Sequence, residues 1–107
     1  MAAEKIEAGS GNVFADVGFA DADTHLLKAG IVARIDKILR RRRLTDKRAA
    51  KLFDLSHEEL SRLVRGHFRK YSVERLLHLL TILGQDVEII THTAKTQRQG
   101  RLSFQVV

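Results

Sequence analysis

The stretch that decides the fold is Leu44–Gly66, LTDKRAAKLFDLSHEELSRLVRG. Thr45 and Ser56 are residue types that cap helix N-termini, because their side-chain oxygen accepts a hydrogen bond from a free backbone N–H of the first turn. Each precedes a short run with apolar residues at helical spacing, and the second run stops at a glycine. The stretch therefore predicts two short helices, over about 46–53 and 57–65.

Only three residues, Asp54–Ser56, join the two predicted helices. A connection this short makes the helices cross steeply, so that they touch only where a small side chain faces a branched apolar one. Ala50 and Leu60 suit that contact, and Leu55 is expected to fill the space beneath it. This spacing predicts a helix-turn-helix. The side chains of its first helix that we expect to point inward are Ala49, Ala50, Leu52 and Phe53.

The second helix of the motif should present an exposed face. Successive residues turn by about 100°, and Leu63 is taken as the inward direction. The side chains that then point outward are His57, Glu58, Ser61, Arg62 and Arg65. Because arginine can bind O6 and N7 of guanine with two hydrogen bonds, we expect Arg62 and Arg65 to contact base edges in a major groove.

The flanking segments predict further helices and two strands. Apolar residues recur every three or four positions between Leu27 and Leu39, which predicts a helix from about Ala22 or Asp23 to Arg42. Ser72 caps another helix, over 73–83. β-Branched residues over 86–91 and alternating apolar residues over 102–106 predict strands.

We therefore expect a mainly α fold: a compact bundle of four to five helices with a helix-turn-helix, plus a short C-terminal β-strand or hairpin. A chain of 107 residues has room for one such domain. The predicted divisions are a flexible leader over 1–12, the helix-turn-helix DNA-binding domain with a terminal strand over 13–91, and a basic connector with a C-terminal strand over 92–107.

The positive charge of the chain is concentrated in its middle third. Of a formal net charge of +6, residues 34–70 hold thirteen Lys and Arg against five Asp and Glu. Such a block attracts polyanions, and nucleic acid is the commonest, because each neutralised phosphate releases condensed counterions. The alternative is that Arg40–Arg43 only cap and solubilise a helix end, where the helix dipole favours cations.

The sequence gives no support to several other classes of protein. Its longest stretch without a charged residue, Leu76–Gln85, is half of the roughly 20 residues that a membrane span needs. There is no cysteine, and the five histidines lack metal-ligand spacing. We find no phosphate-binding glycine loop and no nucleophile motif. We therefore expect a cytoplasmic protein that is not an enzyme and holds no metal or cofactor.

The residues of the motif carry a family resemblance. LTDKRAAKLFDLSHEELSRLVRG resembles the helix-turn-helix of the XRE family, the Cro and phage-repressor type of DNA-binding domain. The flanks NVFADVGFADADTHLLKA and FRKYSVERLLHLLTILGQDVEI resemble the HigA-like antitoxins, which pair with RelE- or HigB-type toxins in bacteria, and the similarity covers about Asn12 to Ile90. The resemblance implies a small dimeric repressor that binds its own operator, double-stranded DNA, and holds a ribosome-dependent endoribonuclease inactive.

Three departures from the family pattern bear on DNA binding. Asp54 stands where the turn usually carries glycine, and aspartate tolerates the left-handed conformation at modest cost. Asp46 and His57 replace the glutamines that are frequent at the starts of both motif helices. Glu58 and Glu59 add acids to the first turn, where they complement the helix dipole. Glu58 could instead accept a hydrogen bond from cytosine N4, and it is expected to pair with Arg62 at i, i+4.

Phosphate contacts are expected beside the predicted base contacts. Lys47, Arg69 and Lys70 are cations close to the helix starts that Thr45 and Ser72 cap, and free N–H groups at helix N-termini receive anions. The full candidate DNA-binding set is Thr45, Lys47, Ser56, His57, Glu58, Ser61, Arg62, Arg65, Arg69, Lys70 and Ser72.

The C-terminal segments bear on the oligomeric state. The two predicted strands should pair with each other in a hairpin or across the subunits of a homodimer, and either arrangement buries Phe104. The alternative is a tail after Thr93 that orders only on a toxin partner. Two other functions stay open: an interaction module that neutralises a toxin or basic partner without specific DNA binding, and, more distantly, an RNA-binding accessory protein.

Overall fold

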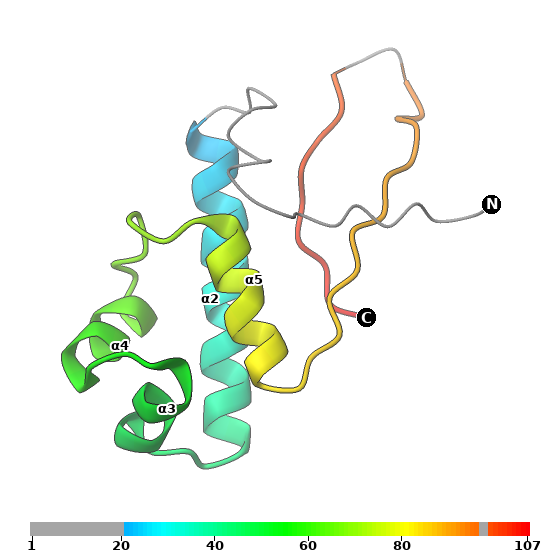
Figure 1. Cartoon of the computed structure of the whole chain (residues 1–107). Helices are drawn as coiled ribbons and strands as arrows, with labels where there is room; N and C mark the ends of the chain where they lie inside the picture. The colour runs from blue at the N-terminus through cyan, green and yellow to red at the C-terminus, as the bar shows by residue number, and fades with distance from the viewer. Residues whose placement is uncertain (1–20, 97–98) are drawn as a thin grey trace.

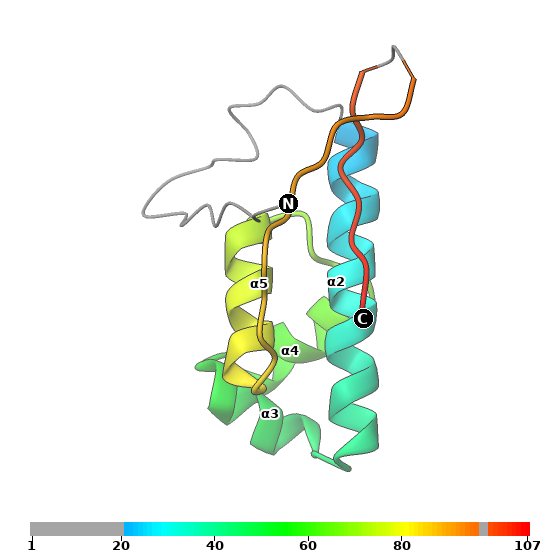
Figure 2. The same ribbon diagram turned by 90° about the vertical axis from the view of Figure 1, so that its right-hand side faces the viewer.

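The computed structural model describes residues 21–96 and 99–107, and the predicted leader lies outside them. The described helices are α2 (Asp21–Arg41), α3 (Asp46–Phe53), α4 (His57–Val64) and α5 (Val73–Ile82). Figures 1 and 2 show α2 and α5 running side by side, with the short helices α3 and α4 packed across one end of this pair. The mainly α fold and the helix-turn-helix predicted from the sequence are confirmed.

Each short helix begins at a hydroxyl residue that the sequence marks as a cap. Thr45 Oγ1 accepts a hydrogen bond from the backbone N–H of Arg48 at 3.2 Å, and Ser72 Oγ accepts one from Arg75 at 3.1 Å. At α4 the pairing is reciprocal: Ser56 Oγ accepts from Glu59 N, and the Glu59 carboxylate accepts from Ser56 N, both at 3.0 Å. This capping box satisfies two N–H groups that a helix start leaves free.

The ends of α3 and α4 depend on residues with positive φ. Asp54 has φ 55° and lets Leu55 N donate to Ala50 O at 2.9 Å, which closes the helix and starts the turn. Gly66 has φ 108°, and His67 N beyond it donates to Arg62 O at 2.9 Å. Asp54 therefore adopts the left-handed conformation in the turn, as expected from the sequence.

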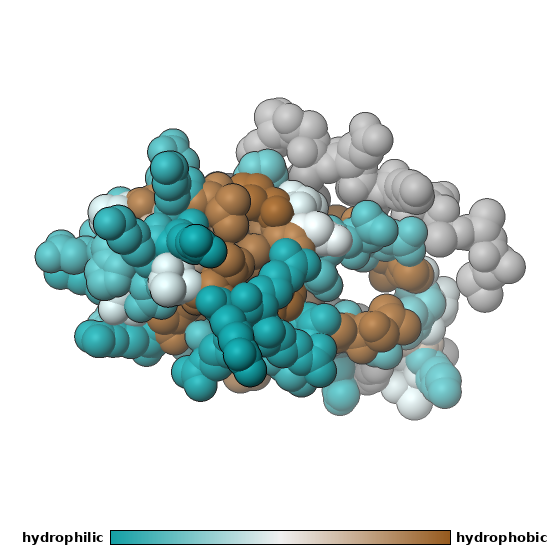
Figure 3. Space-filling view, turned by 90° about the horizontal axis from the view of Figure 1, so that it is seen from below, coloured by the Kyte–Doolittle hydropathy of each residue, from teal (hydrophilic) through white to brown (hydrophobic). Residues whose placement is uncertain are grey.

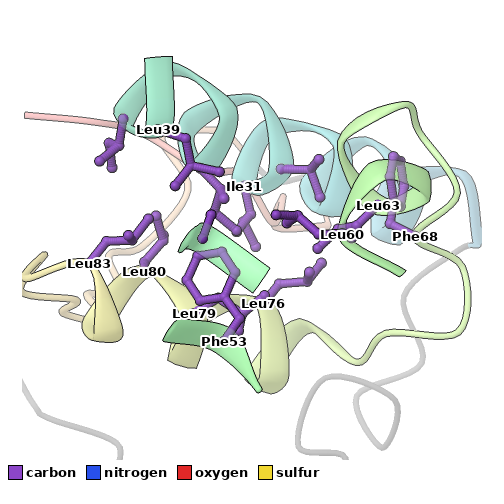
Figure 4. Close-up of a cluster of buried hydrophobic side chains, with 14 of the residues drawn as sticks. Ile31, Leu39, Phe53, Leu60, Leu63, Phe68, Leu76, Leu79, Leu80 and Leu83 are labelled. Carbon is purple, nitrogen blue, oxygen red and sulfur yellow. The ribbon is translucent and has the colours of Figure 1, made fainter. Parts of the chain in front are cut away.

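The core lies between α2 and α5 and extends under the helix-turn-helix (Figure 4). The apolar stripe predicted on α2 is buried throughout, and Ala50, Leu55 and Leu60 are buried at the motif as expected. Leu52 is different: it was expected inward but is 51% exposed. The helical step places it on the flank of α3, because Ala49, Ala50 and Phe53 already fill the inward face.

The predicted C-terminal strands are not present in the described residues. The segments 86–91 and 101–107 are extended, but no hydrogen bond joins their backbones, and Figures 1 and 2 show that they stay apart. The reason is that each segment packs on the helices instead. Phe104 covers Gly30 of α2, where an added methyl group would lie 3.5 Å from Phe104 Cδ2, and Val87 also packs against the core. The prediction of a hairpin within one chain is therefore wrong, whereas pairing across subunits stays a prediction.

Candidate nucleic-acid interface

Helix α4 has one buried and one exposed face. Leu60 and Leu63 are fully buried, which fixes the rotation of the helix about its axis. On the other side His57, Glu58 and Arg62 are exposed, with Arg65 just beyond the last turn, and Ser61 is half-buried at the edge. The exposure predicted for these side chains is thus confirmed for all but Ser61, and two arginines are free to meet a ligand.

Two of the three capping hydroxyls remain able to donate. The oxygens of Thr45 and Ser72 accept backbone hydrogen bonds, so that each hydroxyl proton is left for an acceptor outside the helix, whereas the Ser56 hydroxyl is also bonded to the Glu59 carboxylate. A phosphate oxygen is such an acceptor, and it would also meet the positive end of the helix dipole. Thr45 and Ser56 are exposed, and Ser72 is half-buried.

An open pocket of about 890 Å³ lies between α4, the segment after it and the start of α5. It brings together Arg62, Arg69 and Lys70 from the predicted set. Apart from Glu59, four further side chains in its lining are absent from the predicted set: His25, His67, Tyr71 and Arg75. Their place could not be read from local sequence, because the pocket joins the start of α2 to residues more than 30 positions away.

Two contacts around this pocket hold the Arg75 side chain and the backbone of the loop before α5. The Arg75 guanidinium carbon lies 5.0 Å from the centre of the Tyr71 ring, within the range of a cation–π interaction. Lys28 Nζ donates to Arg69 O at 3.2 Å and so ties the loop to α2. Burial raises the pKa of the Tyr71 hydroxyl, and the charge of Arg75 acts in the opposite direction. The hydroxyl is therefore protonated at neutral pH and can donate to an anion.

Glu59 lies in the same pocket, but it serves the helix. The hydrogen bond from the Ser56 backbone N–H, followed by that from the Ser56 hydroxyl, lowers the pKa of its carboxyl. Glu59 is therefore ionised at neutral pH and turned toward its own helix start. The spacing Ser56-His57-Glu58-Glu59 is the sequence signature of a capping box and could have revealed this role.

Near the exposed face Asp46 has a side-chain partner, whereas the pair predicted for Glu58 is not formed in the described residues. His57 Nε2 lies 3.9 Å from Asp46 Oδ2, so that these two side chains link the first turns of α3 and α4. The expected pair between Glu58 and Arg62 is not formed in the described residues. Both side chains are exposed, where solvation and side-chain entropy offset most of the gain of an ion pair.

The remaining candidates stand apart from the pocket. Lys47 is exposed in the first turn of α3 and does not line the pocket. In the run Arg40–Arg43, Arg40 Nε is 3.0 Å from Asp36 Oδ2 on the same helix, which fits the structural alternative for that residue.

Residues 21–96 and 99–107 contain neither a metal-ligand cluster nor a membrane-spanning helix. No group of three or more His, Asp or Glu side chains in this part of the chain is arranged to hold a metal ion. None of its helices is long and apolar enough to span a bilayer.

Comparisons with known proteins agree with this geometry. A family model described as a helix-turn-helix domain matches residues 13–91. No curated protein matches the chain. A solved structure assigned to the XRE family of transcriptional regulators is similar, with a TM-score of 0.72 and 30% sequence identity over 82% of this chain and 98% of that one. The chain therefore belongs to the helix-turn-helix family and, within it, to the XRE type.

Proposed function

We propose that this protein is a sequence-specific, DNA-binding repressor of transcription that reads its operator with α4. The observation that carries the proposal is the exposed face of α4, with Arg62 and Arg65 next to a pocket that adds further cations. A helix fits the major groove of B-DNA, where each base pair presents a distinct pattern of donors and acceptors. The similarity to an XRE-family transcriptional regulator supports the regulatory role.

The proposed contacts fall into two groups. Arg62 and Arg65 bind guanine O6 and N7, while Glu58, Ser61 and His57 contact neighbouring base edges. The residues that position the protein on phosphates are Thr45, Lys47, Ser56, Arg69, Lys70 and Ser72, and we add His67, Tyr71 and Arg75 from the pocket. Arg62 also lines the pocket, so that one side chain joins the base-reading face to the phosphate-binding one.

We further propose that the repressor acts as a homodimer in the bacterial cytoplasm. Helix α4 has eight residues and is therefore about 12 Å long, which covers only a few base pairs. A two-fold dimer presents a second α4 about 34 Å away, one turn of DNA farther on.

The antitoxin role rests on the resemblance of the flanking segments alone. On that basis we propose that the protein neutralises a RelE- or HigB-like toxin and represses the operon that encodes both. Expression of a small basic protein encoded next to this gene should arrest growth, and co-expression of the present chain should restore it. Growth arrest that persists during co-expression would contradict the antitoxin role and would leave the proposed repressor role untouched.

The repressor role is tested by selection of binding sites. Duplexes enriched from a random pool by the full chain should share one motif, and the same motif should be protected from nuclease cleavage upstream of the gene. Lys95→Ala, which removes an exposed cation outside the helix-turn-helix, is the control variant and should enrich the same motif. Enrichment of no motif would favour the interaction module, because the exposed acids Asp46 and Glu58 at the starts of α3 and α4 repel phosphate.

A further inference from the structure

We propose that the pocket between α4 and the start of α5 binds a small polyanion with linked phosphate groups, such as a nucleoside diphosphate, and that this ligand competes with operator DNA. Arg62, Arg69, Lys70 and Arg75 supply the cations of this pocket. The competition rests on the proposed function, because it needs an α4 that binds the operator. Binding of the polyanion itself does not, and it is measured without DNA.

The cations of this pocket are not neutralised within the described part of the chain. Its lining holds four Lys and Arg side chains against one carboxylate, that of Glu59. Glu59 accepts a hydrogen bond from the backbone N–H of Ser56 at the start of its own helix. None of the four cations forms an ion pair within residues 21–96 and 99–107. Because like charges around one cavity repel each other, an anion of matching charge stabilises the arrangement.

The charge of the pocket favours linked phosphate groups over a single monoanion. Four cations and one carboxylate leave a surplus of three positive charges. At neutral pH a terminal phosphate carries a charge of about −1.5 to −2, and a phosphate linked on both sides adds about −1. A diphosphate therefore comes close to neutralising the pocket. The three guanidinium groups suit this ligand as well, since each can bind two phosphate oxygens with parallel hydrogen bonds.

The pocket is large enough to hold more than the phosphate groups. Its volume of about 890 Å³ lies within the range of roughly 300–1,000 Å³ that is usual for small-molecule sites. The contribution of α2 to its lining is His25, whose ring lies 4.8 Å from that of the buried Phe68. The exposed imidazole is held by this contact, and it offers a flat surface on which a nucleobase can stack.

A ligand in the pocket would occupy groups that the proposed DNA contacts need. Arg62 belongs both to the pocket and to the exposed face of α4, and Arg69 and Lys70 are proposed phosphate contacts. Figure 3 shows that hydrophilic side chains cover most of the molecule on the side of α3 and α4, so that charge governs what binds there. Cations that are already neutralised release fewer counterions from DNA, and the affinity for the operator falls. The pocket thereby makes repression respond to the concentration of the ligand.

The single tyrosine of the chain gives a direct measurement of binding. Tyr71 lines the pocket and the chain has no tryptophan, so that its intrinsic emission comes from this site. Inorganic pyrophosphate, the first probe, is titrated into the full chain at constant ionic strength and without DNA. The emission should change and reach saturation.

Calorimetric titration with nucleotides distinguishes a free ligand from one carried by a nucleoside. ADP should bind more tightly than pyrophosphate, because the base adds a stacking contact, and AMP should bind about tenfold more weakly than ADP. Equal affinities for ADP and pyrophosphate would support the linked phosphates as the ligand and would contradict a contact with the nucleoside.

Matched variants assign the binding to the pocket. Lys70 and Lys51 are both exposed, but only Lys70 lines the pocket. Lys70→Ala should weaken pyrophosphate binding about tenfold through the loss of one charge-assisted contact, and Lys51→Ala should leave it unchanged. His25→Ala should weaken ADP binding about fivefold or more through the loss of stacking. Its binding to duplex DNA should be unchanged, because His25 is not among the proposed DNA contacts.

Tyrosine emission that stays constant up to about 10 mM pyrophosphate would overturn the proposal, and so would equal losses of affinity in Lys70→Ala and Lys51→Ala. Pyrophosphate that binds without weakening the binding of a labelled operator duplex would contradict the competition. Failure of the proposed DNA binding is seen separately. Arg65 does not line the pocket, so Arg65→Ala should impair operator recognition while pyrophosphate still binds.

Discussion

Arg62 and Arg65 differ from the other arginines of the chain in where the fold places them. Leu60 and Leu63 fix α4 against the core, and these two guanidinium groups are left on the opposite, exposed side. We predict that Arg62→Ala and Arg65→Ala each cost about 1–3 kcal/mol of binding free energy on the operator and little on random duplex. Fluorescence anisotropy with both DNAs checks this, and equal losses on both would reduce the arginines to phosphate contacts.

Glu59 shows how one residue can stabilise the interface without touching DNA. Its pKa is lowered by the hydrogen bonds from Ser56, so its ionised form stabilises the fold at neutral pH. This contribution should be present above the ordinary carboxyl value of 4.5 and be lost as the pH falls through the lower, folded-state value. Urea denaturation should therefore give Glu59→Gln a lower free energy of unfolding than the parent at pH 7, and the two values should converge in acid.

Glu58→Gln is the control for this measurement. Glu58 is on the same turn of α4, but in the described part of the chain it caps no backbone N–H. We expect its removal to leave the pH profile of stability close to that of the parent. A profile changed equally by both substitutions would assign the effect to the helix dipole and not to the capping box.

At the scale of elements, the turn between α3 and α4 depends on the backbone of Asp54. Its φ of 55° is left-handed, a conformation that costs an ordinary L-residue about 1–2 kcal/mol. We predict that Asp54→Val, with a β-branched side chain, lowers the free energy of unfolding by at least about 1 kcal/mol, whereas Asp54→Gly does not lower it. Urea denaturation measures both; equal stabilities would show that the turn relaxes to another conformation.

The helices could be predicted because their starts and ends are decided locally. Thr45, Ser56 and Ser72 cap the helices that follow, and Gly66 adopts the positive φ that its position suggested. Leu52 was misplaced because a hydrophobic residue on the flank of a short helix has the same local pattern as one facing the core. Only the packed structure distinguishes a flank position from a core-facing one in such a helix.

The pocket and the packing of the extended segments 86–91 and 101–107 required more than local pattern. The pocket assembles His25 with Arg62 and Arg75 through the packing of α2 against α4 and α5, so no window of sequence contains it. These two segments have the alternation of strands, but a strand is defined by hydrogen bonds to a neighbour. No backbone hydrogen bond of the described residues joins the two segments, and the residue pattern alone could not indicate that.

For the whole molecule, the charge distribution determines how binding responds to salt. The cations of residues 34–70 have different surroundings. Arg69 lines the pocket, Lys47 lies at the start of α3, and Arg40 is paired with Asp36. Only cations that neutralise phosphates release counterions from DNA. Arg40 should therefore contribute little to the salt dependence of binding, although it adds to the net charge.

We predict that Lys47→Ala and Arg69→Ala each weaken binding to all duplexes to a similar degree, because phosphate contacts carry no sequence information. Each should reduce the magnitude of the negative slope of log K against log salt concentration by about one. Titrations at several salt concentrations, on operator and on random duplex, measure this slope, with Arg40→Ala as a cation-matched control. If Arg40→Ala lowers the slope as much as Arg69→Ala does, the field of the whole molecule and not the pocket binds the backbone of DNA.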